Sequence, residues 1–164
     1  MRETYGVSTI RFEHEGNSTM SRLETLSSDL ASRLRRASKA KRHAVAVAAS
    51  ALAVAKARVE HPVVDEALRQ VRGGHVFTSR VKASIDALAA QLDEEYFELQ
   101  EAAEADKLPA DDYLRAFARA RAVAALSFAG SDASGAADDS IYEAAAAVGD
   151  DKSELFSLVE FALK

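Results

Sequence analysis

Cysteine is absent from this chain of 164 residues. Without it the protein forms no disulfide bond, binds no metal through thiolate ligands and has no cysteine nucleophile. The absence fits a reducing compartment, so we expect a cytoplasmic protein. The charged first twenty residues contain no apolar core segment, and we expect no signal peptide. The richest apolar stretch, residues 44–55, is too short to span a bilayer, so we expect no membrane partner.

Proline is nearly as scarce, since Pro62 and Pro109 are the only two, and much of the 48% hydrophobic content is alanine. Alanine is the best helix former because its side chain loses no conformational entropy in a helix. With 29% charged residues the chain should fold, and its length suits one domain. The sequence therefore predicts an all-α protein with a single helical domain over residues 21–164.

The first twenty residues differ from the rest of the chain. Their hydrophobic residues are interspersed with polar ones, and Gly6 and Gly16 interrupt them. Three interpretations stay open for this N-terminal arm of residues 1–20: a short strand, a segment packed on the domain, or a flexible terminus.

The first helix should begin near Ser21, where the apolar spacing becomes helical. Ser21 and Glu24 match a capping box, in which each side chain satisfies a backbone donor at the helix start. Leu26 belongs to the apolar stripe that we expect to be buried. Whether residues 21–60 form one helix or two helices broken near Ser38 stays open.

The later helices should begin and end at residues that favour helix termini. We expect a buried stripe that includes Leu114 in the helix starting at Asp111. One helix should run from Pro62 to Gly73-Gly74, the next from Thr78 or Ser79 to Asp106, and the one after it from Asp111 to the loop of residues 130–135. A shorter helix should end at Gly149. The last helix should begin at a second capping box, formed by Asp151 and Glu154. The total is six or seven helices, in an antiparallel bundle or a stack of helical hairpins.

Charge is distributed unevenly around a formal net charge of -5. Residues 22–58 are basic and residues 93–160 are strongly acidic. Either the two parts pair within the fold, or one of them faces a partner. The densest basic run is Arg33, Arg35, Arg36, Lys39, Lys41 and Arg42, of which Arg35, Lys39 and Arg42 would share one side of a continuous helix.

Motifs for catalysis or metal binding are missing. The acidic cluster of residues 93–104 contains no Glu-x-x-His motif of the kind that di-iron bundles use. No two of His14, His43, His61 and His75 are three or four residues apart, and neither a Gly-x-Ser-x-Gly elbow nor a phosphate-binding glycine loop occurs. We expect no catalytic residue, no metal and no cofactor, and hence no enzyme.

One stretch resembles a known family. The segment of residues 61–76, a proline-led helix that ends in a glycine turn, is similar to the second helix of alanine-rich, all-helical immunity proteins from bacterial polymorphic-toxin systems. Residues 119–124 are similar to the alanine-rich inner helix of the same proteins. The resemblance implies a protein that binds and neutralises a cognate toxin. Many such toxins are nucleases with basic grooves, to which an acidic helical surface would be steered.

The favoured hypothesis is thus a non-enzymatic protein-binding module, an immunity protein whose acidic surface binds a basic toxin domain. The expected partner-binding residues are Asp93, Glu94, Glu98, Glu101, Asp111, Asp112 and Tyr113. Three alternatives stay open. The chain could be a structural or regulatory protein that forms a homodimer, a small helical enzyme with carboxylate chemistry, or a nucleic-acid-binding regulator that uses Arg33 to Arg42. A sequence pI of about 5.4 disfavours nucleic acid as the partner.

Overall fold

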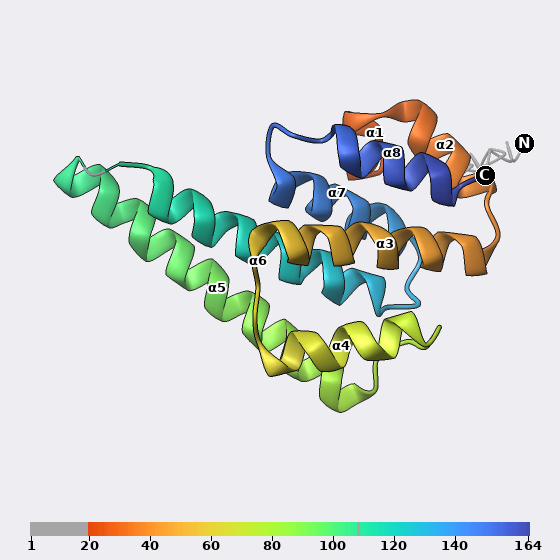
Figure 1. Ribbon diagram of the computed structural model, residues 1–164, viewed down its shortest axis with the longest axis horizontal. Coiled ribbons are helices and arrows are strands. Elements are labelled where there is room, and N and C mark those ends of the chain that lie inside the picture. The colour runs from red at the N-terminus through yellow and green to blue at the C-terminus, as the bar shows by residue number, and fades with distance from the viewer. Residues whose placement is uncertain (1–19, 108) are drawn as a thin grey trace, which may run out of the picture.

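A computed structural model describes residues 20–107 and 109–164, and every regular element within them is a helix (Figure 1). The helices are α1 (Arg22–Leu26), α2 (Ser28–Arg36), α3 (Lys39–Ala57), α4 (Pro62–Arg72), α5 (Ser79–Asp106), α6 (Asp111–Ala129), α7 (Ala136–Val148) and α8 (Ser153–Ala162). The all-α expectation is therefore confirmed for the described part of the chain, with eight helices in it rather than six or seven. The expected arm of residues 1–20 lies, except for Met20, outside the described residues.

The additional helices arise where serine side chains start new helices. Ser27 accepts a hydrogen bond from the Leu30 N–H at the start of α2, and Ser38 accepts one from the Lys41 N–H at the start of α3. A serine hydroxyl competes in this way with continuation of the preceding helix. Residues 22–57 therefore form three helices. The capping box predicted at Ser21 is wrong, because its hydroxyl makes no cap hydrogen bond at the start of α1.

The second predicted capping box, of Asp151 with Glu154, is also wrong. Lys152 occupies the cap position of α8, and no side chain caps this helix. Asp151 instead accepts a hydrogen bond of 3.1 Å from the Ser153 hydroxyl. Its other oxygen lies 3.9 Å from the Lys56 ammonium, so the Asp151 carboxylate is directed toward side chains and not toward the first backbone donors of α8.

The boundaries of α4 and α5 match the predictions. Pro62 occupies the first turn of α4, where its missing N–H costs no hydrogen bond. Gly74, directly after that helix, has a φ of +80°, a conformation that glycine adopts without steric cost. The Thr78 hydroxyl accepts from the Val81 N–H at the start of α5, which ends at Asp106.

The centre of the protein is made by α3, α7 and the later turns of α6, which pack against one another (Figure 1). Small side chains let these helices approach closely. The buried alanines include Ala49 and Ala53 of α3, Ala120, Ala122 and Ala125 of α6, and Ala144 and Ala145 of α7. The Ser140 hydroxyl of α7 donates a buried hydrogen bond of 2.8 Å to the Ala125 carbonyl of α6. Around this centre α8 packs on α3, α1 packs on α7, and α4 packs on α5.

The helices α5 and α6 form a long antiparallel hairpin whose far end projects away from the other helices (Figure 1). At that end only α5 covers α6, and the predicted burial of Leu114 is wrong, because the side chain is 53% exposed. Leu26, also predicted to be buried, is exposed at the end of α1. None of the helices in the described ranges combines the length and the apolar character needed to cross a membrane.

The end of α6 approaches the loop before α5 so closely that it requires glycine. The Phe77 N–H donates a 2.9 Å hydrogen bond to the Gly130 carbonyl, and a Cβ at Gly130 would lie 2.2 Å from the Phe77 ring. We expect Gly130→Ala to lower the free energy of unfolding by about 1–3 kcal/mol through overpacking, measured by urea denaturation. The control Gly73→Ala, whose nearest neighbour is the movable His75 side chain, should cost clearly less. Equal losses would contradict the steric explanation.

Candidate protein-binding surface

Basic residues near the N-terminus pair with acidic residues near the C-terminus. Lys56 of α3 lies 2.6 Å from Glu154 of α8, and Arg33 of α2 lies 4.0 Å from Glu160 of α8. The interpretation that the two charged parts complement each other within the fold is therefore confirmed for these acids. Such exposed pairs contribute little stability, but they remove the acids of α8 from a free negative surface.

The predicted basic face is not formed, because the chain breaks between α2 and α3. Arg35 lies on α2 and forms an ion pair with Glu24, whereas Lys39 and Arg42 lie on α3. Arg42 donates a hydrogen bond of 2.7 Å to the Ala37 carbonyl at the end of α2. The run Arg33 to Arg42 therefore does not present one continuous helical side.

The buried carboxylate of Glu143 joins α1, α6 and α7. Glu143 is 3% exposed and accepts hydrogen bonds from Arg22 at 2.7 Å and from Arg121 at 2.9 Å. The Arg22 guanidinium also bonds to Asp139 and lies 4.6 Å from the centroid of the Tyr142 ring. This geometry compensates the buried charge with two cations, which a buried carboxylate requires.

Asp93, one of the predicted partner-binding residues, belongs to this same network. Arg121 donates a 2.5 Å hydrogen bond to it across the two helices of the hairpin. Burial alone would lower the pKa of Arg121, but the hydrogen bond to Asp93 and the charges of Glu143 and Asp93 outweigh this effect and raise the pKa. The structure therefore gives Asp93 an internal partner and sets it apart from the acids that follow it.

Those following acids point away from the fold. Leu92 and Ala103 of α5 are buried, so the helical spacing places Glu94, Glu98 and Glu101 on the opposite side of the helix, where all three are exposed. We call these three glutamates the acidic row. Within residues 20–107 and 109–164, none of them forms an ion pair.

Across the hairpin tip, α6 adds fewer free charges than the sequence predicted. Asp112 pairs with Arg115 at 2.5 Å, so this predicted partner-binding residue has a cation on its own helix. Asp111 is exposed and, in the described part of the chain, has no cationic partner. Glu95 of α5 and Arg119 of α6 also approach each other across the hairpin, to 3.8 Å.

An aromatic cluster lies beside the acidic row. The Tyr96 ring lies 5.0 Å from that of Phe97, 5.2 Å from that of Phe117 and 6.3 Å from that of Tyr113, measured between centroids. Tyr113 is half-buried in this cluster, while Phe97 is 58% exposed. The partner-binding set predicted from the sequence omitted Phe97 and Leu114. Phe97 stands next to acids in the sequence, but nothing local indicates that Leu114 is uncovered.

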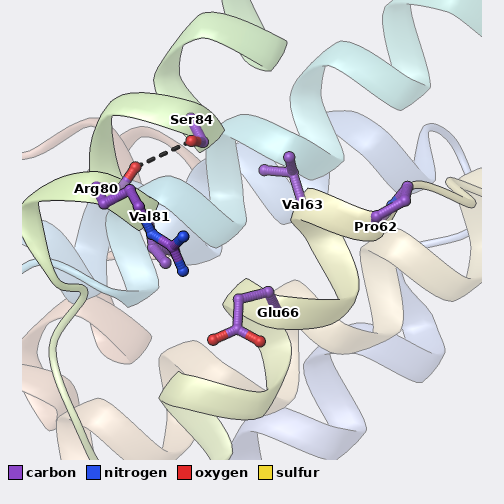
Figure 2. Close-up of a pocket in the computed structure, with 6 residues that line it drawn as sticks. All are labelled: Pro62, Val63, Glu66, Arg80, Val81 and Ser84. Atoms are coloured by element: carbon purple, nitrogen blue, oxygen red, sulfur yellow. Dashed lines mark hydrogen bonds between the residues drawn. The ribbon is translucent and has the colours of Figure 1, made fainter.

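The concave sites are shallow. Figure 2 shows a pocket of about 240 Å³ between α4 and α5, lined by Pro62, Val63, Glu66, Arg80, Val81 and Ser84. Its Ser84 hydroxyl donates to the Arg80 carbonyl at 3.0 Å and so is not paired with a base. No group of three or more potential metal-ligating side chains occurs within the described ranges.

Comparison with known proteins adds no relative. No family model matches the chain, and no curated protein and no solved structure is significantly similar to it. The functional argument therefore depends on the surface itself.

Removing the charge of Glu143 should destabilise the fold. In Glu143→Gln, Arg22 and Arg121 lose the carboxylate between them, and we expect the free energy of unfolding to fall by about 2–3 kcal/mol. The control Glu66→Gln neutralises a carboxylate that pairs with Arg69 at the surface, so it should change stability by less than about 1 kcal/mol. Urea denaturation measures both. If Glu143→Gln lowers the free energy of unfolding no more than Glu66→Gln does, the network of Glu143 with Arg22 and Arg121 does not stabilise the fold.

The base of the hairpin should weaken at low pH. Burial alone would raise the pKa of Asp86, but hydrogen bonds from Lys82 at 2.8 Å and from Ser127 at 2.5 Å lower it below its ordinary value of 3.8. A carboxyl with a depressed pKa stabilises the fold above its unfolded pKa, and this contribution is lost as the pH falls through the folded pKa.

Asp86→Asn should therefore lower the Tm at pH 7 and have a much smaller effect near about pH 2. Circular dichroism melting at the two pH values measures the difference. Asp132→Asn, in the exposed loop after α6, is the control and should change neither value. A decrease in Tm of the same size at both pH values would rule out the ion pair as its cause.

Proposed function

We propose that this chain is a non-enzymatic, cytoplasmic protein-binding module that uses the acidic row and the adjoining tip of the α5–α6 hairpin to bind a basic protein surface. One observation carries the proposal. Asp139 and Glu143 of α7, like Glu154 and Glu160 of α8, have cationic partners inside the fold, whereas Glu94, Glu98 and Glu101 have none in the described chain. The unbalanced negative charge is therefore concentrated on the element that projects furthest (Figure 1).

The physical consequence is long-range attraction of a positive partner. Uncompensated charges on a projecting helix raise the association rate with an oppositely charged surface. Exposed aromatic and aliphatic groups next to those charges supply the apolar contact that charge alone does not. Phe97 and Leu114 are such groups.

An immunity protein is the specific form of this proposal. The partner would be a toxin domain with a basic groove for its own substrate, which the acidic hairpin would cover. Support comes from the resemblance of residues 61–76 to helical immunity proteins and from the charge of the hairpin. The partner-binding residues are Glu94, Glu98, Glu101, Asp111 and Tyr113, while Asp93 and Asp112 serve mainly to pair Arg121 and Arg115.

Affinity capture from a lysate of the native host, with tagged protein as bait, tests the proposal. Wild type should retain a basic protein domain, and salt should weaken its binding. The variant Glu94→Gln, Glu98→Gln, Glu101→Gln should bind the purified domain about tenfold more weakly and with less dependence on salt. Co-expression with that domain should protect cells from its toxicity only when the acidic row is intact.

A matched control separates local charge from net charge. Glu60→Gln, Asp132→Asn and Asp150→Asn neutralise three exposed acids outside the hairpin, so both triple variants have the same formal net charge. The control should bind as wild type does. Equal weakening in both variants would overturn the proposed surface, and capture of nucleic acid alone would overturn the proposed class of partner.

A further inference from the structure

One side of the hairpin is covered by α7 over only part of its length. Ser140 of α7 bonds to Ala125 of α6, and Glu143 of α7 bonds to Arg121 of α6, which sets an antiparallel register. Leu114 lies seven residues before Arg121 on α6. In an antiparallel register it is therefore opposite the residue seven positions after Glu143, which is Asp150. Because α7 ends at Val148, it stops before it reaches Leu114.

Phe97 and Leu114 lie on that same side. Asp93 and Arg121 pair across it, and Arg121 also bonds to Glu143 of α7 there. Phe97 follows Asp93 by four residues, so it lies on the same face of α5 as Asp93. Leu114 precedes Arg121 by seven residues, so it lies on the same face of α6 as Arg121. We call the side of the hairpin beyond the end of α7, where Phe97 and Leu114 are exposed, the uncovered flank.

Nothing else in the described chain covers this flank. After α7 the chain turns away, and α8 packs on α3 (Figure 1). The two exposed large hydrophobic residues of the hairpin, Phe97 and Leu114, therefore lie where a further helix would continue the line of α7. Two antiparallel helices form a groove into which the side chains of a third helix fit.

We propose that the uncovered flank binds a basic amphipathic helix of the partner protein, which packs against Phe97 and Leu114 where α7 stops. The inference rests on the proposed function and specifies its partner. Charge selects the occupant. Glu94 and Glu101 are the neighbours of Phe97 at three and four residues along α5, so carboxylates border the apolar flank. A helix with leucine-like residues on one face and lysine or arginine beside them satisfies both features.

A designed peptide provides a probe that does not require the natural partner. It has about 18 residues, with leucine at helical spacing, lysine elsewhere and one tryptophan among the leucines. Because this protein contains no tryptophan, the fluorescence of the peptide alone reports burial of its apolar face. We expect saturable binding with a blue-shifted emission. A scrambled peptide of the same composition should bind at least about tenfold more weakly, because its apolar residues no longer share a face.

Paired variants locate the binding site. Phe97→Ser with Leu114→Ser should weaken binding of the peptide about tenfold or more, since both side chains are anchors of the flank. The control Val76→Ser with Phe161→Ser removes two exposed apolar residues outside the hairpin and should leave the affinity unchanged. All four side chains are largely exposed, so both variants should fold, as unchanged circular dichroism would verify.

The outcomes separate this inference from the proposed function. If neutralising the acidic row weakens binding but the Phe97 and Leu114 variant binds like its control, the flank is overturned and the acidic surface stands. Equal binding of the scrambled peptide would also overturn the flank. If the acidic-row variant binds the peptide as wild type does, charge does not select the helix. The proposal that the bound helix is basic is then overturned. Failure of the acidic row in the host-lysate experiment alone would instead contradict the proposed function.

Discussion

The close packing of α3, α6 and α7 through alanine is the constraint on which the rest of the structure depends. With Ala49, Ala120 and Ala144 fully buried on the three helices, their backbones can approach closely enough for the Ser140 hydroxyl to bond to a carbonyl of α6. Such packing leaves α5 only the remaining side of α6. Because the first turn of α6 and the part of α5 beside it extend beyond the end of α7, no third helix of the described chain packs against the hairpin tip.

The same packing explains how the charges are distributed. A carboxylate inside an alanine-lined core must be compensated, and Glu143 is compensated by Arg22 and Arg121. Those two arginines also bind Asp139 and Asp93, so five charged side chains from α1, α5, α6 and α7 meet around one point. Three basic residues near the N-terminus, Arg22, Arg33 and Lys56, pair with acids of α7 and α8. In the described chain, Glu94, Glu98, Glu101 and Asp111 of the hairpin have no cationic partner, so free negative charge gathers near its tip.

These two features place the candidate site. A projecting hairpin gives access from several directions, and its free acids lie next to an aromatic cluster in which Tyr96 contacts Tyr113 and Phe117. Phe97 and Leu114 remain exposed because the fold supplies no helix to cover them. Charge for attraction and apolar area for contact thus occur together on one element, as in many surfaces that bind other proteins.

The sequence by itself determined the helical class, the ends of α4 and α5 and the acidity of the hairpin, because helix propensity, the caps at Pro62 and Thr78 and the glycine after α4 act within a few residues. Only the tertiary structure decided which acids are free. Asp93 and Glu94 are neighbours in the sequence, yet one meets Arg121 and the other meets solvent. Likewise Leu114 has the spacing of a buried residue and is exposed, because burial depends on whether a helix distant in the sequence reaches that level.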